Sequence, residues 1–338
     1  MEQAISTAQR SGNSRADRKT KASGTTTRSG TVFGLDVHAE IPLSFLEGAS
    51  AEPGGRRLEI SASSGDGTKL EWPQDAELVC DERAPDGAQI FRIESHPQAG
   101  YLISGPQYGS FLLSADGGQL RCCREDCPEN NFQQLLIAQV LPFASLLQGL
   151  EVFHAGAVVK DGQAVALLGR SGAGKTSIAL ECCRRGASFL ADDVLALEPN
   201  GDALLAHPGT ALAGVDHAEG EHIGTGAGLS SEQIFTVDSR KQLVRMTGAV
   251  EPAPLGALFF LDRRPDGPEH PRFEPATDAR MLLSSTFNFV LSTPERLRRL
   301  LEVCALAAQL RVERMVVGSA ADSSELAGAI VQRLSPSP

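Results

Sequence analysis

One stretch of the chain has glycines, a lysine and a threonine at a spacing that binds phosphate. Residues 169–176 match the pattern G-x-x-x-x-G-K-[ST]. Glycines let the backbone turn tightly and point its N–H groups at an anion, the lysine reaches the β- and γ-phosphates, and the hydroxyl coordinates Mg²⁺. We therefore predict a nucleotide site formed by Gly169, Arg170, Ser171, Gly172, Ala173, Gly174, Lys175 and Thr176.

The flanking segments have the character that this loop requires. An apolar run at residues 164–168 predicts a strand that enters the loop, and residues 176–185 predict a helix that leaves it. Gly186 follows where a C-terminal cap belongs. The positive end of the helix dipole would then face the phosphates.

Acidic residues follow the next predicted strand, residues 189–190. Asp192 and Asp193 come at its carboxyl end, where Mg²⁺ and a nucleophile must lie beside a phosphate loop. One carboxylate can hold the metal, and the other can accept a proton from an attacking hydroxyl. An ordinary acidic turn is the alternative, but the position directly after the strand that follows the loop's own helix favours a site.

A histidine lies on the predicted strand before the loop, which covers residues 153–159. His154 is followed there by Ala155 and Gly156. A lone histidine is more often structural than catalytic, and the residues alone leave both interpretations open.

Together these motifs resemble the catalytic domain of the HPr kinase/phosphorylase family. The resemblance includes His154-Ala155-Gly156, the phosphate loop, Arg185-Gly186 and the run from Leu190 to Asp193, and it covers about residues 153–197. It implies a fold related to phosphoenolpyruvate carboxykinase, with ATP and Mg²⁺ as cofactors.

The resemblance also implies roles for single residues. Asp193 stands at the position of the family's proton acceptor, Lys175 and His154 stand at positions counted as active, and Thr176 stands where a hydroxyl binds Mg²⁺. We expect Asp192 to contribute to catalysis and to serve with Thr176 as a metal ligand. Two further motifs of the family, a second signature with a metal-binding Glu and an arginine motif, are not found. We therefore do not expect phosphorylase activity or HPr itself as the acceptor.

Patterning divides the chain into three parts. Residues 1–30 are basic and lack periodic apolar residues, which predicts a disordered tail. Residues 31–128 predict a small β-rich domain, with strands at 57–60 and 89–93 and a hairpin around 115–118. Residues 129–338 predict an α/β domain of the P-loop kinase type.

The sequence predicts the extent, the caps and the buried faces of helices in this second domain. A helix is expected over residues 131–147, although Pro142 must kink or break it. A long helix is expected to begin at Thr293-Pro294, with Leu297 and Leu301 in the core and Arg296 and Arg299 on a solvated face. Ser324 is expected to cap a last helix.

Composition excludes several classes of protein. The formal charge of −11 disfavours a general nucleic-acid binder, and no apolar run approaches the length of about 20 residues that spans a bilayer. The seven cysteines fit reduced thiols in a cytoplasmic protein better than a zinc site. They are Cys80, Cys122, Cys123, Cys127, Cys182, Cys183 and Cys304.

The leading hypothesis is a kinase that transfers the γ-phosphate of Mg-ATP to a hydroxyl, such as serine, of a protein or peptide. A small-molecule kinase of the same fold is an alternative. A nucleotide-binding regulatory module with weak or no ATPase activity is another, and the missing second signature favours it. The sequence leaves open whether the chain forms a homo-oligomer.

Overall fold

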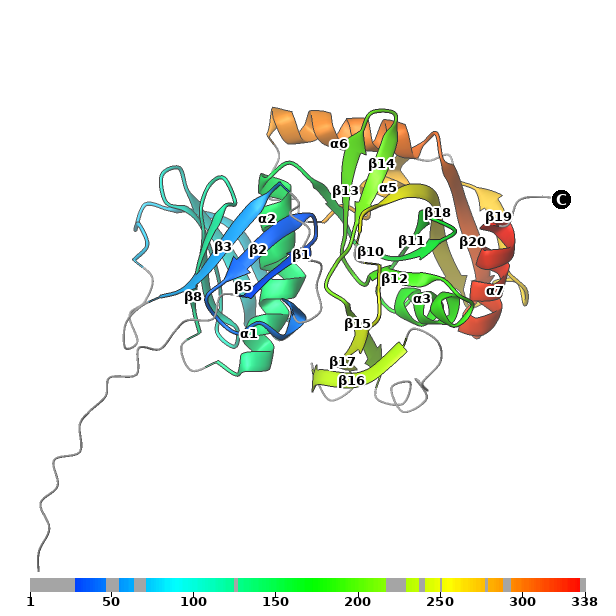
Figure 1. Cartoon of the computed structure of the whole chain (residues 1–338), viewed down its shortest axis with the longest axis horizontal. Coiled ribbons are helices and arrows are strands. Elements are labelled where there is room, and N and C mark those ends of the chain that lie inside the picture. The colour runs from blue at the N-terminus through cyan, green and yellow to red at the C-terminus, as the bar shows by residue number, and fades with distance from the viewer. Residues whose placement is uncertain are drawn as a thin grey trace, which may run out of the picture.

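The computed structural model describes residues 28–46, 55–63, 71–124, 127–216, 229–236, 241–249, 251–276, 279–287 and 293–334. They form a mixed α/β structure with three sheets, as the sequence predicts in its coarse outline (Figure 1). In these ranges no helix has the length and apolar character needed to cross a bilayer. The predicted tail lies mostly outside the described residues, but its last part, from Arg28 to Gly30, belongs to a strand, and there the prediction is wrong.

The front sheet has eight strands in the order β1-β2-β3-β8-β7-β6-β5-β4. β3 pairs in parallel with β2 and β8, and the other pairs are antiparallel. The predicted hairpin is confirmed, because β7 and β8 pair across it with Leu113 opposite Leu120. The strands are β1 (Arg28–Val32), β2 (Leu35–Ala39), β3 (Arg57–Ala62), β4 (Glu77–Arg83), β5 (Gln89–His96), β6 (Gly100–Gly105), β7 (Gly109–Leu113) and β8 (Gln119–Cys123).

A helical segment packs on the front sheet and continues through Pro142. It consists of α1 (Glu129–Leu135), a π-helical turn η2 (Leu136–Val140) and α2 (Leu141–Leu147). A short 3-10 helix, η1 (Ser44–Leu46), precedes it in the chain. Pro142 lies at the start of α2, directly after the π turn, so the bond that its missing N–H cannot make falls at this irregularity and not inside a regular α-helix.

These helices belong to a different packing unit from the one the sequence suggested. Phe132, Leu136 and Phe143 share one core with front-sheet residues such as Phe111 and Leu58. The sequence pattern assigns residues 129–147 to the second domain, because an apolar helix face does not indicate which sheet it will cover. The core that they join also includes residues of the second unit, so the two units share buried surface.

The second sheet has nine strands and carries the predicted loop. Its main path runs β12-β10-β11-β18-β14-β13-β9, with β20 beside β18 and β19 beside β20. β11, β18 and β20 run parallel, so their carboxyl ends meet at one edge. The strands are β9 (Glu151–Phe153), β10 (Ala155–Lys160), β11 (Gln163–Gly169), β12 (Ser188–Ala191), β13 (Leu195–Asn200), β14 (Ala203–His207), β18 (Ala253–Arg264), β19 (Arg272–Pro275) and β20 (Arg311–Gly318).

Helices cover both faces of this sheet. On one face, α3 (Lys175–Arg184) and α7 (Ser323–Leu334) bury Ile178 and Ile330 against Phe259. On the other face, α5 (Ala279–Leu283) and α6 (Pro294–Ala307) lie against Leu258 and Phe260. Successive residues of β18 therefore point to opposite layers, as the pleat of a strand requires.

The helix termini confirm one predicted cap and correct another. The hydroxyl of Thr293 accepts a hydrogen bond from the backbone N–H of Arg296 at 3.3 Å, as predicted. At α7 the cap is Asp322, which accepts from the backbone N–H of Ser324 at 3.1 Å. The Ser324 hydroxyl instead accepts from the guanidinium of Arg185 at 2.7 Å.

The orientation of α6 differs from the prediction. Arg296 is buried and Arg299 points inward, where both guanidinium groups face the fully buried carboxylate of Glu151 on β9. Burial raises the pKa of Glu151, and the two arginines oppose that rise. Leu297 and Leu301 are consequently exposed, which corrects their assignment to the core.

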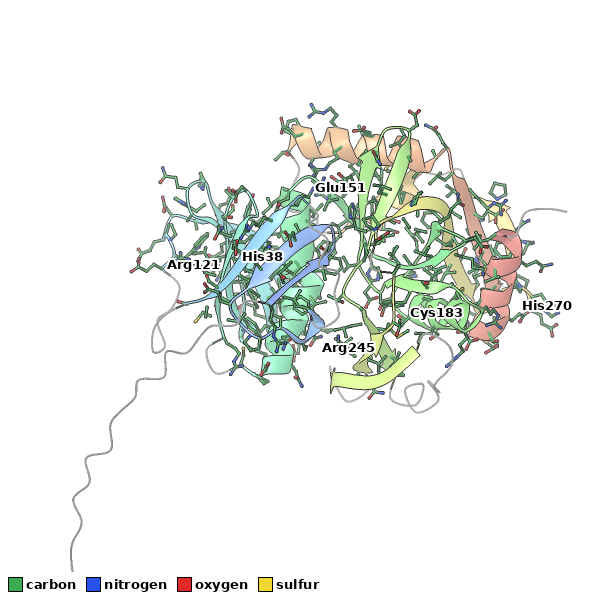
Figure 2. The ribbon with its side chains drawn as sticks, in the orientation of Figure 1. His38, Arg121, Glu151, Cys183, Arg245 and His270 are labelled. Carbon is green, nitrogen blue, oxygen red and sulfur yellow. The ribbon has the colours of Figure 1, made fainter. Side chains whose placement is uncertain are left out.

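The third sheet and several polar contacts join the two units. It consists of β15 (Leu212–Asp216), β17 (Lys241–Met246) and β16 (Leu229–Thr236), in that order. Arg245 on β17 lies between the units in Figure 2 and donates to the backbone oxygen of Ser44 at 3.1 Å. Arg56 forms an ion pair with Glu198 of β13 at 2.5 Å.

Candidate functional site

The predicted phosphate loop joins β11 to α3 as expected. Gly169, Gly172 and Gly174 have φ values of 152°, 78° and 90°, which favour glycine. Gly174 is the N-cap of α3, so the first N–H groups of the helix open toward the loop. A side chain at Gly169 would put a Cβ 3.0 Å from the backbone oxygen of Leu261 on β18. The loop geometry therefore suits an anion and requires glycine at its first position.

Lys175 is buried and points back along the loop. Its Nζ donates to the backbone oxygen atoms of Gly169 at 3.0 Å and Arg170 at 3.4 Å, and lies 3.0 Å from Nε2 of His154. Burial lowers the pKa of Lys175, and the carboxylates of Asp193 and Asp192 oppose that effect. The ammonium group is thus held at the start of the loop by acceptors of modest strength, which a phosphate oxygen can replace.

His154 connects the lysine to the acidic turn. Its Nδ1 lies 3.0 Å from the backbone oxygen of Asp193, which can only accept, so Nδ1 carries the proton and Nε2 accepts from Lys175. Burial lowers the pKa of His154, and the positive charge of Lys175 lowers it further, which agrees with a neutral ring. His154 lies at a break between strands, since β9 pairs with β13 while β10 pairs with β11 and β12. The apolar run at residues 153–159 predicts one continuous strand, and in this respect the prediction is wrong.

Thr176 and Asp192 meet beside the loop. The threonine hydroxyl donates to Oδ1 of Asp192 at 2.8 Å, and the backbone N–H of Gly214 donates to Oδ2 at 2.9 Å. Burial raises the pKa of Asp192 to about 7, and the neighbouring charge of Asp193 raises it as well. A carboxylate in this setting gains most from a nearby cation.

Asp193 is exposed beside this pair. Its φ of 60° lies in the left-handed region, which aspartate tolerates better than most residues. The turn is closed by a bond of 2.7 Å from the backbone N–H of Val194 to the oxygen of Asp192. The structure thus brings Lys175, Thr176, Asp192 and Asp193 to one edge of the sheet, as the motif spacing predicts.

The oxygen atoms of Thr176 and Asp192 suit Mg²⁺. Mg²⁺ takes oxygen ligands and is usually held by one or two carboxylates together with phosphate oxygens. Among the described residues no three His, Cys, Asp or Glu side chains gather into a group that could hold a metal ion. His217 and His222, which stand five residues apart in a glycine-rich stretch, lie outside the described residues.

Arg263, near the end of β18, contacts the phosphate loop. Its Nε donates to the backbone oxygen of Ala173 in the loop at 2.8 Å. Its Nη1 donates to the backbone oxygen atoms of Ala321 at 2.8 Å and Ser319 at 3.2 Å. The guanidinium therefore connects the phosphate loop to the segment before α7, and a Cβ at Gly174 would lie 3.2 Å from it.

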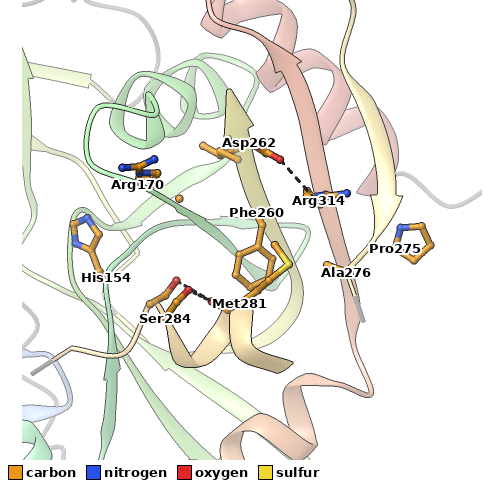
Figure 3. Close-up of a pocket in the computed structure, with 12 residues that line it drawn as sticks. His154, Arg170, Phe260, Asp262, Pro275, Ala276, Met281, Ser284 and Arg314 are labelled. Carbon is orange, nitrogen blue, oxygen red and sulfur yellow. Dashed lines mark hydrogen bonds and ion pairs between the residues drawn. The ribbon is translucent and has the colours of Figure 1, made fainter. Parts of the chain in front are cut away.

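A cavity of about 600 Å³ adjoins the loop (Figure 3). His154, Gly169 and Arg170 border the cavity on the loop side. Phe260 of β18 lines it as well and lies near the middle of the picture. No sequence motif indicated this cavity, because its remaining walls come from β19, β20 and the residues around α5.

Comparison with known proteins gives distant structural neighbours only. No protein-family model and no curated protein matches the chain. The structure of the HPr(Ser) kinase/phosphatase from Coxiella burnetii matches over 47% of this chain and 98% of its own, with 16% sequence identity and a TM-score of 0.25. Such a score establishes neither a common fold nor a common activity.

Proposed function

We propose that this chain is a kinase that transfers the γ-phosphate of Mg-ATP to a hydroxyl, such as serine, of a protein or peptide. The observation that carries this proposal is the convergence of four groups at the start of α3. They are the ammonium of Lys175, the hydroxyl of Thr176, the carboxylate of Asp192, and Asp193 beside them. A cation, two oxygens that can bind a metal and a carboxylate that can accept a proton are the groups that phosphoryl transfer requires.

Each group has a role in the proposed reaction. The backbone N–H groups of the loop and the helix N-terminus hold the β-phosphate. Lys175 exchanges a backbone acceptor for an oxygen of the γ-phosphate, and His154 keeps the ammonium at the start of the loop. Thr176 and Asp192 hold Mg²⁺, which when bound neutralises charge on the β- and γ-phosphates.

The acidic turn completes the transfer. The oxygen of the acceptor hydroxyl bonds to the γ-phosphorus, and Asp193 accepts the proton that this hydroxyl loses. The bond between that phosphorus and the β–γ bridging oxygen breaks, and ADP leaves. Catalysis then comes mainly from positioning and electrostatic stabilisation, since the protein forms no covalent bond to the phosphoryl group.

Transfer from γ-labelled ATP in a lysate of the source cells tests this function. We expect the wild type with Mg²⁺ to label a protein or peptide band, and Asp193→Asn to bind Mg-ATP but lose the band. Asp161→Asn is the matched control, because Asp161 is also exposed and has a φ of 51°, yet lies on the β10–β11 turn. Transfer at the wild-type rate by Asp193→Asn would refute the proton-acceptor role.

The distribution of the label separates the alternatives. Label in a small phosphorylated metabolite would indicate a small-molecule kinase of the same fold. Label that stays in ATP, or is released only as free phosphate, would favour a regulatory nucleotide-binding module.

A further inference from the structure

The cavity beside the loop lies at one end of the nucleotide site. Gly169, Arg170 and His154 line it, and these three residues are the ones that hold the ammonium of Lys175. In a phosphate loop the lysine reaches the β- and γ-phosphates, while the backbone N–H groups cradle the α- and β-phosphates. The cavity therefore opens at the γ-phosphate end, where an acceptor must approach.

The walls away from the loop are largely apolar. Phe260 of β18, Met281 of α5, Pro275 at the end of β19 and Ala276 after it line the cavity, and Figure 3 shows Phe260 and Met281 beside each other. The volume lies within the range of about 300–1,000 Å³ typical of ligand sites, and exceeds what one hydroxyl side chain fills. An occupant must therefore carry an apolar group besides its hydroxyl.

Polar groups border this apolar wall. The Ser284 hydroxyl donates to the backbone oxygen of Met281 at 2.8 Å, so its oxygen retains a lone pair for a ligand N–H. Asp262 and Arg314 lie on the side away from His154, 3.8 Å apart, and each has a second ion-pair partner, Arg264 and Glu274 respectively. Because these charges neutralise one another, this border suits the uncharged N–H and C=O groups of a peptide better than a carboxylate or phosphate.

We propose that the cavity is the acceptor subsite, and that it takes a peptide segment with a hydroxyl residue directly beside a large apolar residue. This inference rests on the proposed kinase function and names its substrate class. The hydroxyl lies toward His154 and the γ-phosphate, and the apolar neighbour packs against Phe260 and Met281. The preference for such peptides arises because an apolar side chain shields the cavity wall from water, whereas a small or charged side chain does not.

A library of nonapeptides with a central serine tests the proposal, with γ-labelled ATP and Mg²⁺. We expect the wild type to label peptides with leucine, methionine or phenylalanine beside the serine about tenfold more than those with alanine or aspartate. Ala276→Trp fills the cavity and reduces labelling about tenfold or more. The dissociation constants of Mg-ATP and inorganic tripolyphosphate remain unchanged. Ala203→Trp, at an exposed position of β14, is the matched control and labels as the wild type does.

A second variant distinguishes a change in peptide preference from a loss of folding. Met281→Ala enlarges the cavity, and we expect it to shift the preferred neighbour toward tryptophan, a gain that an unfolded protein cannot show. If Ala276→Trp weakens Mg-ATP binding but not tripolyphosphate binding, the cavity is a nucleoside site and the proposal is wrong. Unchanged peptide labelling in both cavity variants would also overturn it.

Two wild-type results separate this inference from the function on which it rests. If the wild type binds Mg-ATP and labels a lysate protein but no library peptide, the peptide-segment proposal fails and the kinase stands. If the wild type binds neither Mg-ATP nor tripolyphosphate, the kinase function itself fails, and the acceptor subsite fails with it.

Discussion

Replacing Lys175 by methionine tests two effects of its ammonium group separately. One is the free-energy cost of burying the charge in the folded protein, and the other is the contribution of the charge to nucleotide binding. Lys175 is 5% exposed, and its ammonium lies 3.0 Å from both Gly169 O and His154 Nε2. Methionine keeps most of the length of the side chain but removes the ammonium. Hydrogen bonds to charged groups contribute about 1.5–3 kcal/mol. Loss of one such contact to phosphate therefore weakens Mg-ATP binding by about 10- to 140-fold.

The same substitution has a small effect on the protein without nucleotide. Burial lowers the pKa of Lys175, so the charged form costs free energy in the folded state, and methionine removes that cost. The loss of the bonds to Gly169 and Arg170 acts in the opposite direction. We expect the free energy of unfolding to change by less than about 2 kcal/mol.

Two measurements test this reasoning together. A titration with a fluorescent ATP analogue and Mg²⁺ gives the affinity, and urea unfolding without nucleotide gives the stability. Lys160→Met on β10 is the control, because Lys160 pairs with Asp161 away from the loop. Unchanged ATP affinity in the Lys175 variant would refute the phosphate-loop assignment.

Three further predictions follow from other contacts of the structure. Thr176→Val removes the hydroxyl proposed to bind Mg²⁺, and we expect the Mg²⁺ concentration for half-maximal ATP binding to rise about tenfold. Arg263→Lys loses the two-sided guanidinium contact that joins Ala173 to the segment before α7. We expect KM for ATP to rise about tenfold, with a smaller change in kcat. Arg264→Lys, on the surface, is the control and should change neither value. His207 is buried and its pKa lies below the ordinary 6.5, so protonation of the unfolded chain destabilises the fold as pH falls below about 6.5. In urea unfolding at several pH values, the free energy of unfolding should therefore fall less steeply with decreasing pH for His207→Gln than for the wild type.

The parts of the site that the sequence predicted are those encoded by neighbouring residues. The strand, loop and helix around residues 169–176 depend on local glycines and apolar runs, and the structure has them where expected. Asp192 and Asp193 could be placed because the carboxyl end of a strand is a fixed location in an α/β sheet.

Contacts between distant segments could not be predicted in the same way. Arg263 reaches Ala173 across 90 positions of the chain, and no periodic pattern signals such a bond. The face of α6 was assigned wrongly because Glu151, far upstream, is buried and draws Arg296 and Arg299 inward. Hydropathy places arginines outside and leucines inside, so a buried acid opposite a helix inverts the expected pattern.

The shared core of the two units limits how this protein can be divided. A fragment that begins at residue 129 would retain α1 and α2 but lose the sheet that covers Phe132, Leu136 and Phe143. At about 1.5–3 kcal/mol for each large apolar side chain, exposing these three would cost a sizeable part of the stability of an ordinary domain. Cutting the chain there would thus yield an aggregation-prone piece. Recombinant work on the half that carries the phosphate loop must keep the front sheet attached, and changes in that sheet can reach the candidate site through the common interior.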